Sequence, residues 1–326
     1  MKQSLFEARH HPQWQRFSEQ LDEIERGRGG TPAAETFAGD YRKLCHQLAL
    51  ARERGYSSHL IDHLHRLAMR AHQQLYRHRD TPGAWLAGFV LAGFARRVRA
   101  ERWFVLTAGL LFFSSLIGMG LLVYQFPELV YSVIDPEQVN EMESLYDPAR
   151  SRIGGPLERE SSEDWMMFGY YIMNNIGIAF QTYASGLLLG LGSLFFLLFN
   201  GLTIGAVAGH LTGAGSGHNF WSFVIAHGAF ELTGITLAGA AGLKLGWAVL
   251  APGRYGRAEA LRKAGRSSIE LMAGVILLLV IAAFIEAYWS SMAWPRPALK
   301  YLTGVLLWVV VVSYLTFAGR RAHAPD

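Results

Sequence analysis

Cysteine is nearly absent from this sequence of 326 residues, and Cys45 stands alone. A single cysteine excludes a disulfide bond within the chain and any zinc or iron–sulfur site built from several cysteines of one chain. The sequence also lacks the G-x-x-x-x-G-K-[ST] loop of nucleotide hydrolases and the G-x-S-x-G turn of serine hydrolases. We therefore expect a protein that is not an enzyme and that uses no cofactor. Because residues 1–30 are polar, a cleavable signal peptide is not expected.

Charge is absent from residues 104–123, "FVLTAGLLFFSSLIGMGLLV". At about 1.5 Å per residue, this run spans roughly the 30 Å hydrocarbon core of a bilayer. Similar apolar runs follow, and hydrophobic residues make up 51% of the whole chain. The pattern predicts an all-α, polytopic membrane protein with about six spans, near residues 103–124, 166–199, 202–217, 220–250, 269–289 and 299–318. The glycine-rich 202–217 segment is expected either to span or to re-enter, after a turn at "FNGL" (199–202).

The charges are distributed unevenly between the polar segments. Residues 1–102 carry 17 Lys or Arg against 11 Asp or Glu, and residues 251–268 carry 5 against 1. Residues 125–165 carry 3 against 10. By the positive-inside rule, both termini are expected in the cytoplasm and the acidic 125–165 loop outside. No basic cluster forms a nucleic-acid motif, so nucleic acid is not an expected partner.

The region before the first span contains three segments with apolar side chains at helical spacing. Their residues are Trp14, Phe17, Leu21 and Ile24, then Tyr41, Leu44 and Leu48, then Leu60, Leu64, Leu67 and Leu75. The three helices either form a small bundle or cover one another across a dimer. We expect three parts, namely an amphipathic cytoplasmic region (1–82), an interfacial elbow helix (83–102) and a transmembrane domain (103–326).

Glycine recurs at every fourth position along one apolar segment. The members of this stripe are Gly201, Gly205, Gly209, Gly213 and Gly217. On a helix they form a smooth face that allows another helix to approach closely. Together with Asn200, they are predicted to serve in a helix turn and in helix packing. A gate or a homodimer seam is the alternative use of such a face.

Six polar or ionisable residues interrupt the apolar segments. They are Asn174, Asn175, Gln181, His227, Glu231 and Glu286. From the rise per residue of a helix, all six fall in the outer half of the membrane, and we expect them to converge there as an intramembrane polar cluster. The groups could satisfy one another, take part in the passage of a solute or ion, or switch conformation with a partner. No metal is expected, because "HGAFE" lacks the second histidine of H-E-x-x-H.

Other histidines give no metal-binding pattern. His210 and His218 have no characteristic spacing, and His59 and His63 lie four apart in a region that is rich in histidine throughout. A structural zinc site normally shows a fuller ligand set. A solvated helix face is the expected role of the latter pair.

Several motifs together resemble the stage II sporulation protein M family, also called the DUF95 group. "AHGAFEL" (226–232) is similar to the family's P-H-G-x-x-E-L, with Ala226 in place of the usual proline. The other matching segments are "LARERGYSSHLIDHLHRLAMRAHQQLYR" (50–77), "NNIGIAF" (174–180), "LFNGLTIGAVAG" (198–209), "GAAGLKLGWAVLAPG" (239–253) and "IEAY" (285–288). The resemblance carries over six polar positions, which are Asn174, Asn175, Asn200, His227, Glu231 and Glu286.

The resemblance implies a multi-pass protein of the bacterial cytoplasmic membrane. In spore formers the family member scaffolds cell-wall hydrolases, and elsewhere members are encoded near MoxR-type ATPases and RDD-type membrane proteins. We therefore expect a scaffold or subunit of an envelope-associated complex, with the lipid bilayer, a second copy of the chain and one of these proteins as partners. A transporter or permease for a small solute, ion or lipid is the alternative. An intramembrane hydrolase or metalloenzyme is a third reading.

Overall fold

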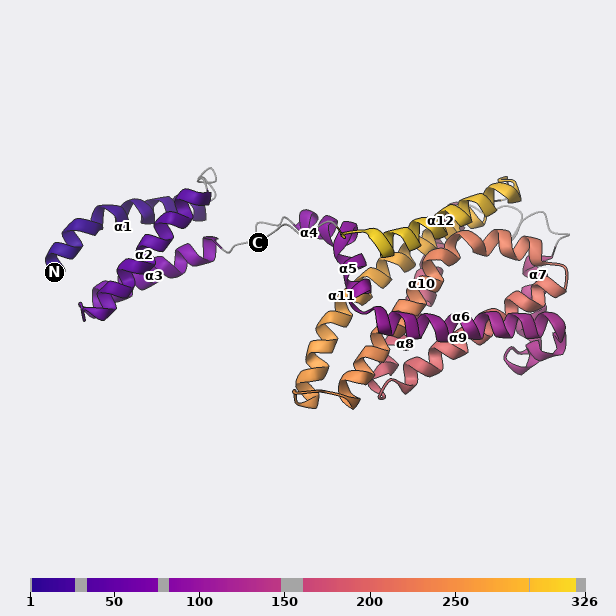
Figure 1. Ribbon diagram of the computed structural model, residues 1–326. Coiled ribbons are helices and arrows are strands. Elements are labelled where there is room, and N and C mark those ends of the chain that lie inside the picture. Colours follow the sequence, from indigo (N-terminus) through magenta and orange to yellow (C-terminus); the bar gives the residue numbers. More distant parts are fainter. Residues whose placement is uncertain (1, 27–33, 76–81, 148–160, 293, 321–326) are drawn as a thin grey trace. The chain divides into compact units, whose positions relative to one another are not determined.

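A computed structural model describes residues 2–26, 34–75, 82–147, 161–292 and 294–320 (Figure 1). Within these ranges the regular structure is helical, and no strand occurs. The chain divides into two compact units, Met1–Gly83 and Ala84–Asp326. Each unit is therefore described by itself. Residues 148–160 of the acidic 125–165 segment and the "GRGGTP" break at 27–32 lie outside the described residues.

Unit 1 is a bundle of three helices, α1 (Gln3–Glu25), α2 (Ala34–Glu53) and α3 (Ser58–Leu75). The apolar residues with helical spacing turn inward and form one core within a single chain, with Leu21 and Leu64 fully buried. The indole Nε1 of Trp14 donates a hydrogen bond of 2.6 Å to the buried amide oxygen of Gln47, which ties α1 to α2. Arg70 of α3 pairs with acidic residues of α1 at the edge of this core. Of the two expected arrangements, the bundle within one chain is confirmed.

Unit 2 contains helices that are long and apolar enough to cross a membrane. Among the residues that the structure describes, five meet this description, and they are α6 (Arg102–Gln125), α9 (Leu191–Gly213), α10 (Gly217–Leu250), α11 with its last turns (Arg257–Ser290) and α12 (Pro297–Phe317). The helix α8 (Ser161–Ala184) is not among the five. Leu106 and Leu110 of α6 are 60% and 71% exposed, as expected for side chains that face lipid. The all-helical class is thus confirmed for the described residues, with five helices of membrane-spanning length and composition where about six spans were expected.

Helix α10 forms the centre of unit 2. It is the most buried of the five candidate spans, and it contacts α6, α8, α9, α11 and α12. Small residues such as Ala238, Gly239, Ala240 and Ala241 are almost fully buried along it, which lets its neighbours approach closely. Polar side chains on α10 are consequently placed between helices.

The chain turns at a different place from the one predicted. Residues 199–202 lie inside α9, so the expected turn at Asn200 and Gly201 is wrong, as is a long span over 166–199. The amide of Asn200 donates to the Phe196 carbonyl at 2.7 Å, which satisfies the side chain without ending the helix. The break comes instead after the short 3-10 turn η3 (Ser185–Leu187), where Leu189 and Gly190 adopt positive φ angles of 54° and 83°.

Gly201, Gly205 and Gly209 of the glycine stripe face α6 of the same chain, and Figure 1 shows α9 and α6 side by side. The expected stripe does not extend to Gly217, which begins α10 and lies against Thr212. A β-carbon at Gly205 would overlap the Leu116 carbonyl, and one at Gly209 would overlap the carbonyl of Gly120. Since α6 covers this face, the stripe supplies no seam for a dimer. Gly186 meets Gly242 of α10 in a similar backbone contact.

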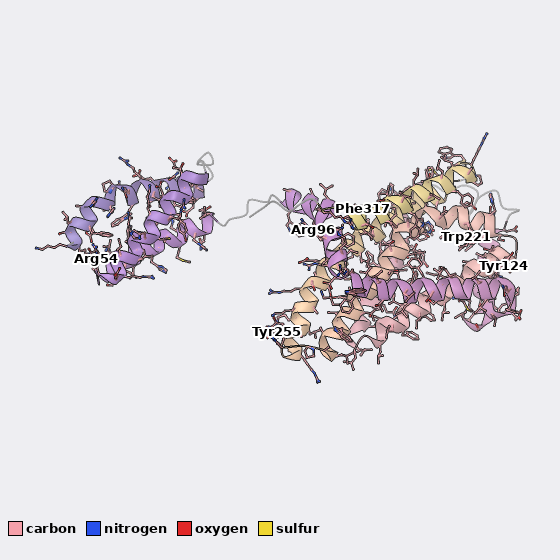
Figure 2. All side chains as sticks on the ribbon, viewed as in Figure 1. Arg54, Arg96, Tyr124, Trp221, Tyr255 and Phe317 are labelled. Atoms are coloured by element: carbon pink, nitrogen blue, oxygen red, sulfur yellow. The ribbon has the colours of Figure 1, made fainter. Side chains whose placement is uncertain are left out.

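The segment before the first span is a short helix, α4 (Pro82–Gly88), then a π turn, η1 (Phe89–Gly93), then α5 (Phe94–Ala100). Phe94 is buried against Gly274 of α11, where a β-carbon would strike its ring. Arg99 donates to the carbonyl of Leu315 at 2.8 Å, and Figure 2 shows Arg96 of α5 near Phe317 at the end of α12. The expected elbow is therefore packed on α11 and α12. The two remaining short helices are η2 (Pro127–Ser132) and α7 (Pro136–Tyr146).

Candidate functional site

Three ionisable side chains meet between α10 and the end of α11. His227 and Glu231 lie one turn apart on α10, and Glu286 comes from the opposite helix. One ligand atom of each residue lies within 4.8 Å of the corresponding atoms of the other two. The side chain of His227 is 4% exposed and that of Glu231 is 19% exposed. We call these three residues the His-Glu-Glu cluster.

A π turn positions the third member of the cluster. After Phe284 the α-helical pattern of α11 changes to a π-helix, η4 (Ile285–Ser290), which contains Glu286 and Ser290. A π turn inserts one extra residue and rotates the side chains that follow, and such turns are frequent at functional sites. Sequence periodicity gives no signal for this change, so the register of the residues after Phe284 could not be predicted.

Ser290 orients the histidine from the far side of its ring. The serine hydroxyl lies 3.0 Å from Nδ1 of His227, within hydrogen-bond distance. The other ring nitrogen, Nε2, lies 3.9 Å from a carboxylate oxygen of Glu231, which is too long for a hydrogen bond. Nδ1 of the imidazole thus lies against Ser290 while Nε2 faces the Glu231 carboxylate.

A buried lysine supports the same serine. Lys300 of α12 is 3% exposed, and its Nζ donates to the Ser290 carbonyl at 2.7 Å. Ser290 therefore links α10, η4 and α12. Sequence analysis missed both residues. Lys300 resembled an ordinary lysine at the end of a span, and Ser290 a small residue near the membrane surface.

Helix α7 packs on the start of α10 next to the cluster. The ring of Tyr146 lies 5.4 Å from that of Phe220 and 5.9 Å from that of Phe223. Asn219 donates to the Tyr146 carbonyl at 3.2 Å. Burial, and after it the charge of Glu286, raises the pKa of Tyr146 above its usual value, so its hydroxyl stays neutral.

A second histidine–glutamate pair holds α7 against α9. Nε2 of His210 lies 2.7 Å from a carboxylate oxygen of Glu143. Among the described residues, no third histidine, cysteine, aspartate or glutamate lies close enough to this pair to complete a metal site. His218 is exposed, and His59 and His63 lie on the exposed face of α3.

The amide residues of α8 form no hydrogen bond with the His-Glu-Glu cluster among the described residues. Asn175 is buried, at 3% exposure, and its Nδ2 has no hydrogen-bond partner among the described residues. Asn174 is exposed and donates to the Asn175 side chain at 3.2 Å. Gln181 is exposed as well, so the structure does not bring it to the His-Glu-Glu cluster.

Comparison with known families matches both units. The family model described as stage II sporulation protein M matches residues 105–291, and a domain of unknown function, DUF8413, matches residues 4–77. An uncharacterized protein of Methanocaldococcus jannaschii is 27% identical over 123 residues, which covers 37% of this chain and 69% of that protein. No solved structure matches the chain significantly. The first family match includes all three residues of the cluster.

Proposed function

Because the chain belongs to the stage II sporulation protein M family, we propose that it is a non-enzymatic membrane subunit that recruits a partner protein to the membrane. In this proposal unit 1 is the docking domain and unit 2 is the membrane anchor. The observation that carries it is that unit 1 has a closed core of its own and forms a compact unit separate from the membrane helices. A domain that buries its own core presents its remaining surface for binding.

The surface of unit 1 offers a polar groove between α1 and α2. The groove has a volume of about 220 Å³, and Arg16 and Lys43 line it together with Gln13 and Gln20. Neither basic residue is needed for the core, which is apolar. Lys43 pairs at 3.0 Å with Asp40, which also lines the groove, so Arg16 is the basic residue that would complement an acidic side chain of a partner.

In unit 2 the proposed role of the His-Glu-Glu cluster is conformational. His227, Ser290 and Lys300 connect α10, η4 and α12 through hydrogen bonds at one end of the helices. Polar contacts between membrane helices fix their relative positions, because the alternative is an unsatisfied polar group in hydrocarbon. A partner that acts on α7 would act next to this junction.

The partner classes follow from the family resemblance. They are a MoxR-type ATPase, an RDD-type membrane protein or a cell-wall hydrolase, with a second copy of the chain as a further partner. The proposed location is the bacterial cytoplasmic membrane with both termini inside. The basic 251–268 segment, compared with the acidic 125–165 segment, supports this orientation.

Crosslinking and co-purification of the full-length protein from its native membrane test the docking role. We expect one co-purified protein to be lost when Arg16 and Lys43 are both changed to Glu. The matched control is Arg66→Glu, an exposed basic residue on α3 outside the groove, which should retain the partner. Equal recovery from both variants would contradict docking through unit 1.

Transport is the second candidate function, and the cluster is the observation that favours it. Ionisable side chains inside membrane helices commonly mark the path of an ion or proton. Protein reconstituted in liposomes should then carry a flux of ions or protons, and this flux should disappear in Glu231→Gln. The control is Glu143→Gln, which changes the other histidine–glutamate pair and should leave the flux intact. A protein that carries no flux and still retains its partner supports the subunit role.

A further inference from the structure

We infer that the His-Glu-Glu cluster is a binding site for a divalent first-row transition metal ion. The inference is independent of the docking role proposed above. Its basis is that His227, Glu231 and Glu286 each present one ligand atom, from two different helices, within 4.8 Å of one another. A proposal of this kind could not come from the sequence alone, because Glu286 lies 55 positions beyond Glu231 and after a π turn.

The histidine has the arrangement of a metal ligand. Its Nδ1 lies 3.0 Å from the Ser290 hydroxyl, and its Nε2 lies 3.9 Å from a carboxylate oxygen of Glu231. Histidines that bind metals usually have their second ring nitrogen fixed by a hydrogen bond in this way, which orients the ring. Since His227 is 4% exposed, its ring lies among protein groups rather than in water, with the two carboxylates within 4.8 Å of one of its nitrogens.

The charges of the cluster also call for a cation. No Lys or Arg of the described chain forms an ion pair with Glu231 or Glu286. The ammonium of the buried Lys300 donates to the Ser290 carbonyl. Two carboxylates close together in a buried site repel each other, and a divalent cation would neutralise both at once.

The ligand types select the class of metal. Imidazole nitrogen with carboxylate oxygen suits Zn²⁺, Mn²⁺ and related ions, whereas Mg²⁺ and Ca²⁺ prefer oxygen ligands alone. Ligand atoms at about 2.0–2.2 Å from a tetrahedral Zn²⁺ lie about 3.3–3.6 Å from one another. Separations of up to 4.8 Å in the cluster therefore have to close by up to about 1.4 Å, which requires the carboxylate side chains to rotate toward the ion. Three protein ligands leave a coordination position for water.

A bound ion would join α10 to η4 directly. Without it, these elements are linked at this point through the His227–Ser290 hydrogen bond. Metal binding to a folded site stabilises the folded state, because the unfolded chain lacks the preformed ligand set. The melting temperature of the protein should therefore rise with added metal.

Zinc binding to the full-length protein in detergent tests the inference. After treatment with a chelator, the wild-type protein should take up about one Zn²⁺ per chain, measured by calorimetry and elemental analysis. Glu231→Gln and Glu286→Gln should each weaken binding at least about tenfold, and Ser290→Ala should weaken it about 10- to 100-fold through loss of histidine orientation. The matched control, Glu143→Gln, should bind as the wild type does.

X-ray absorption of the zinc-loaded wild type identifies the atoms that coordinate the zinc ion. A first shell of one nitrogen and several oxygens is expected, and its nitrogen contribution should be lost in His227→Gln. The inference is overturned if the wild type binds no stoichiometric zinc, if Glu143→Gln weakens binding as much as Glu231→Gln does, or if the bound zinc has several nitrogen ligands. Partner recovery through unit 1 is measured separately, so either proposal can fail without the other.

Discussion

The hydroxyl of Ser290 lies 3.0 Å from Nδ1 of His227, and this contact joins η4 to the central helix α10. The two residues are 63 positions apart in the sequence. Through its backbone carbonyl, Ser290 also accepts the Lys300 ammonium. One small residue therefore connects three helices beside two carboxylates.

Removing the serine hydroxyl should destabilise the membrane unit. We expect Ser290→Ala to lower the free energy of unfolding by about 0.5–2 kcal/mol, the range for hydrogen bonds between membrane helices. Ser291→Ala is the control, because that hydroxyl bonds within its own helix, to the Ala287 carbonyl. Denaturation in detergent micelles measures both variants. An equal loss in the two would show that the His227 contact contributes nothing.

Lys300 should contribute through the same junction. Lys300→Met keeps the length of the side chain and removes the donor to the Ser290 carbonyl. We therefore expect its free energy of unfolding to be lower than that of the wild type by about 1 kcal/mol. Lys263→Met changes an exposed lysine of α11 and should leave the free energy of unfolding within about 0.5 kcal/mol of the wild type. Because Lys300 and His227 share Ser290, the double variant Ser290→Ala with Lys300→Met tests whether the two losses are additive.

Close contact between α6 and α9 should make Gly205 sensitive to size. A β-carbon there would overlap the Leu116 carbonyl, so Gly205→Ala has to separate the helices and should cost about 1–3 kcal/mol. Gly213→Ala is the matched control in the same stripe, because its β-carbon would lie 3.8 Å from the Tyr124 ring, an ordinary contact. Thermal unfolding of the two variants compares them. A stable Gly205→Ala protein would contradict the close approach.

The core of unit 1 should depend on its buried amide. Gln47→Ala leaves the Nε1 of Trp14 without its acceptor, so we expect a loss of about 1–3 kcal/mol in the stability of unit 1. Gln15→Ala on the exposed face of α1 should change it by less than about 0.5 kcal/mol. Tryptophan fluorescence is a poor readout with nine tryptophans, so hydrogen exchange at α1 and α2 is the measurement. Equally faster exchange in both variants would show that the loss does not come from the Trp14–Gln47 hydrogen bond.

Helix periodicity accounts for much of what the sequence could predict. Trp14, Phe17 and Leu21 turn to the core of unit 1 because three- and four-residue steps keep them on one face. The same rule places His227 and Glu231 together. It also explains why Gln181 is exposed although Asn175 is buried. The step of six residues from one to the other turns the helix by about 600°, which places the two side chains on different faces of α8.

Local sequence rules failed where packing decided the outcome. An Asn-Gly pair favours a turn, yet Asn200 is satisfied by the Phe196 carbonyl, and Gly201 lies against Ser115 and the carbonyl of Phe112 on α6. The chain turns at Leu189 and Gly190, next to α10. The π turn that contains Glu286 has no signature in the pattern of apolar residues, so the direction of this side chain could not be predicted.

Crosslinking tests most directly whether the carboxylates of α10 and η4 meet. Replacing Cys45 by Ser gives a chain without cysteine, into which Glu231→Cys and Glu286→Cys are introduced together. We predict rapid bridging of this pair by Hg²⁺ within one chain, and none for the pair Gln181→Cys with Glu231→Cys. Bridging of the second pair but not the first would contradict the account.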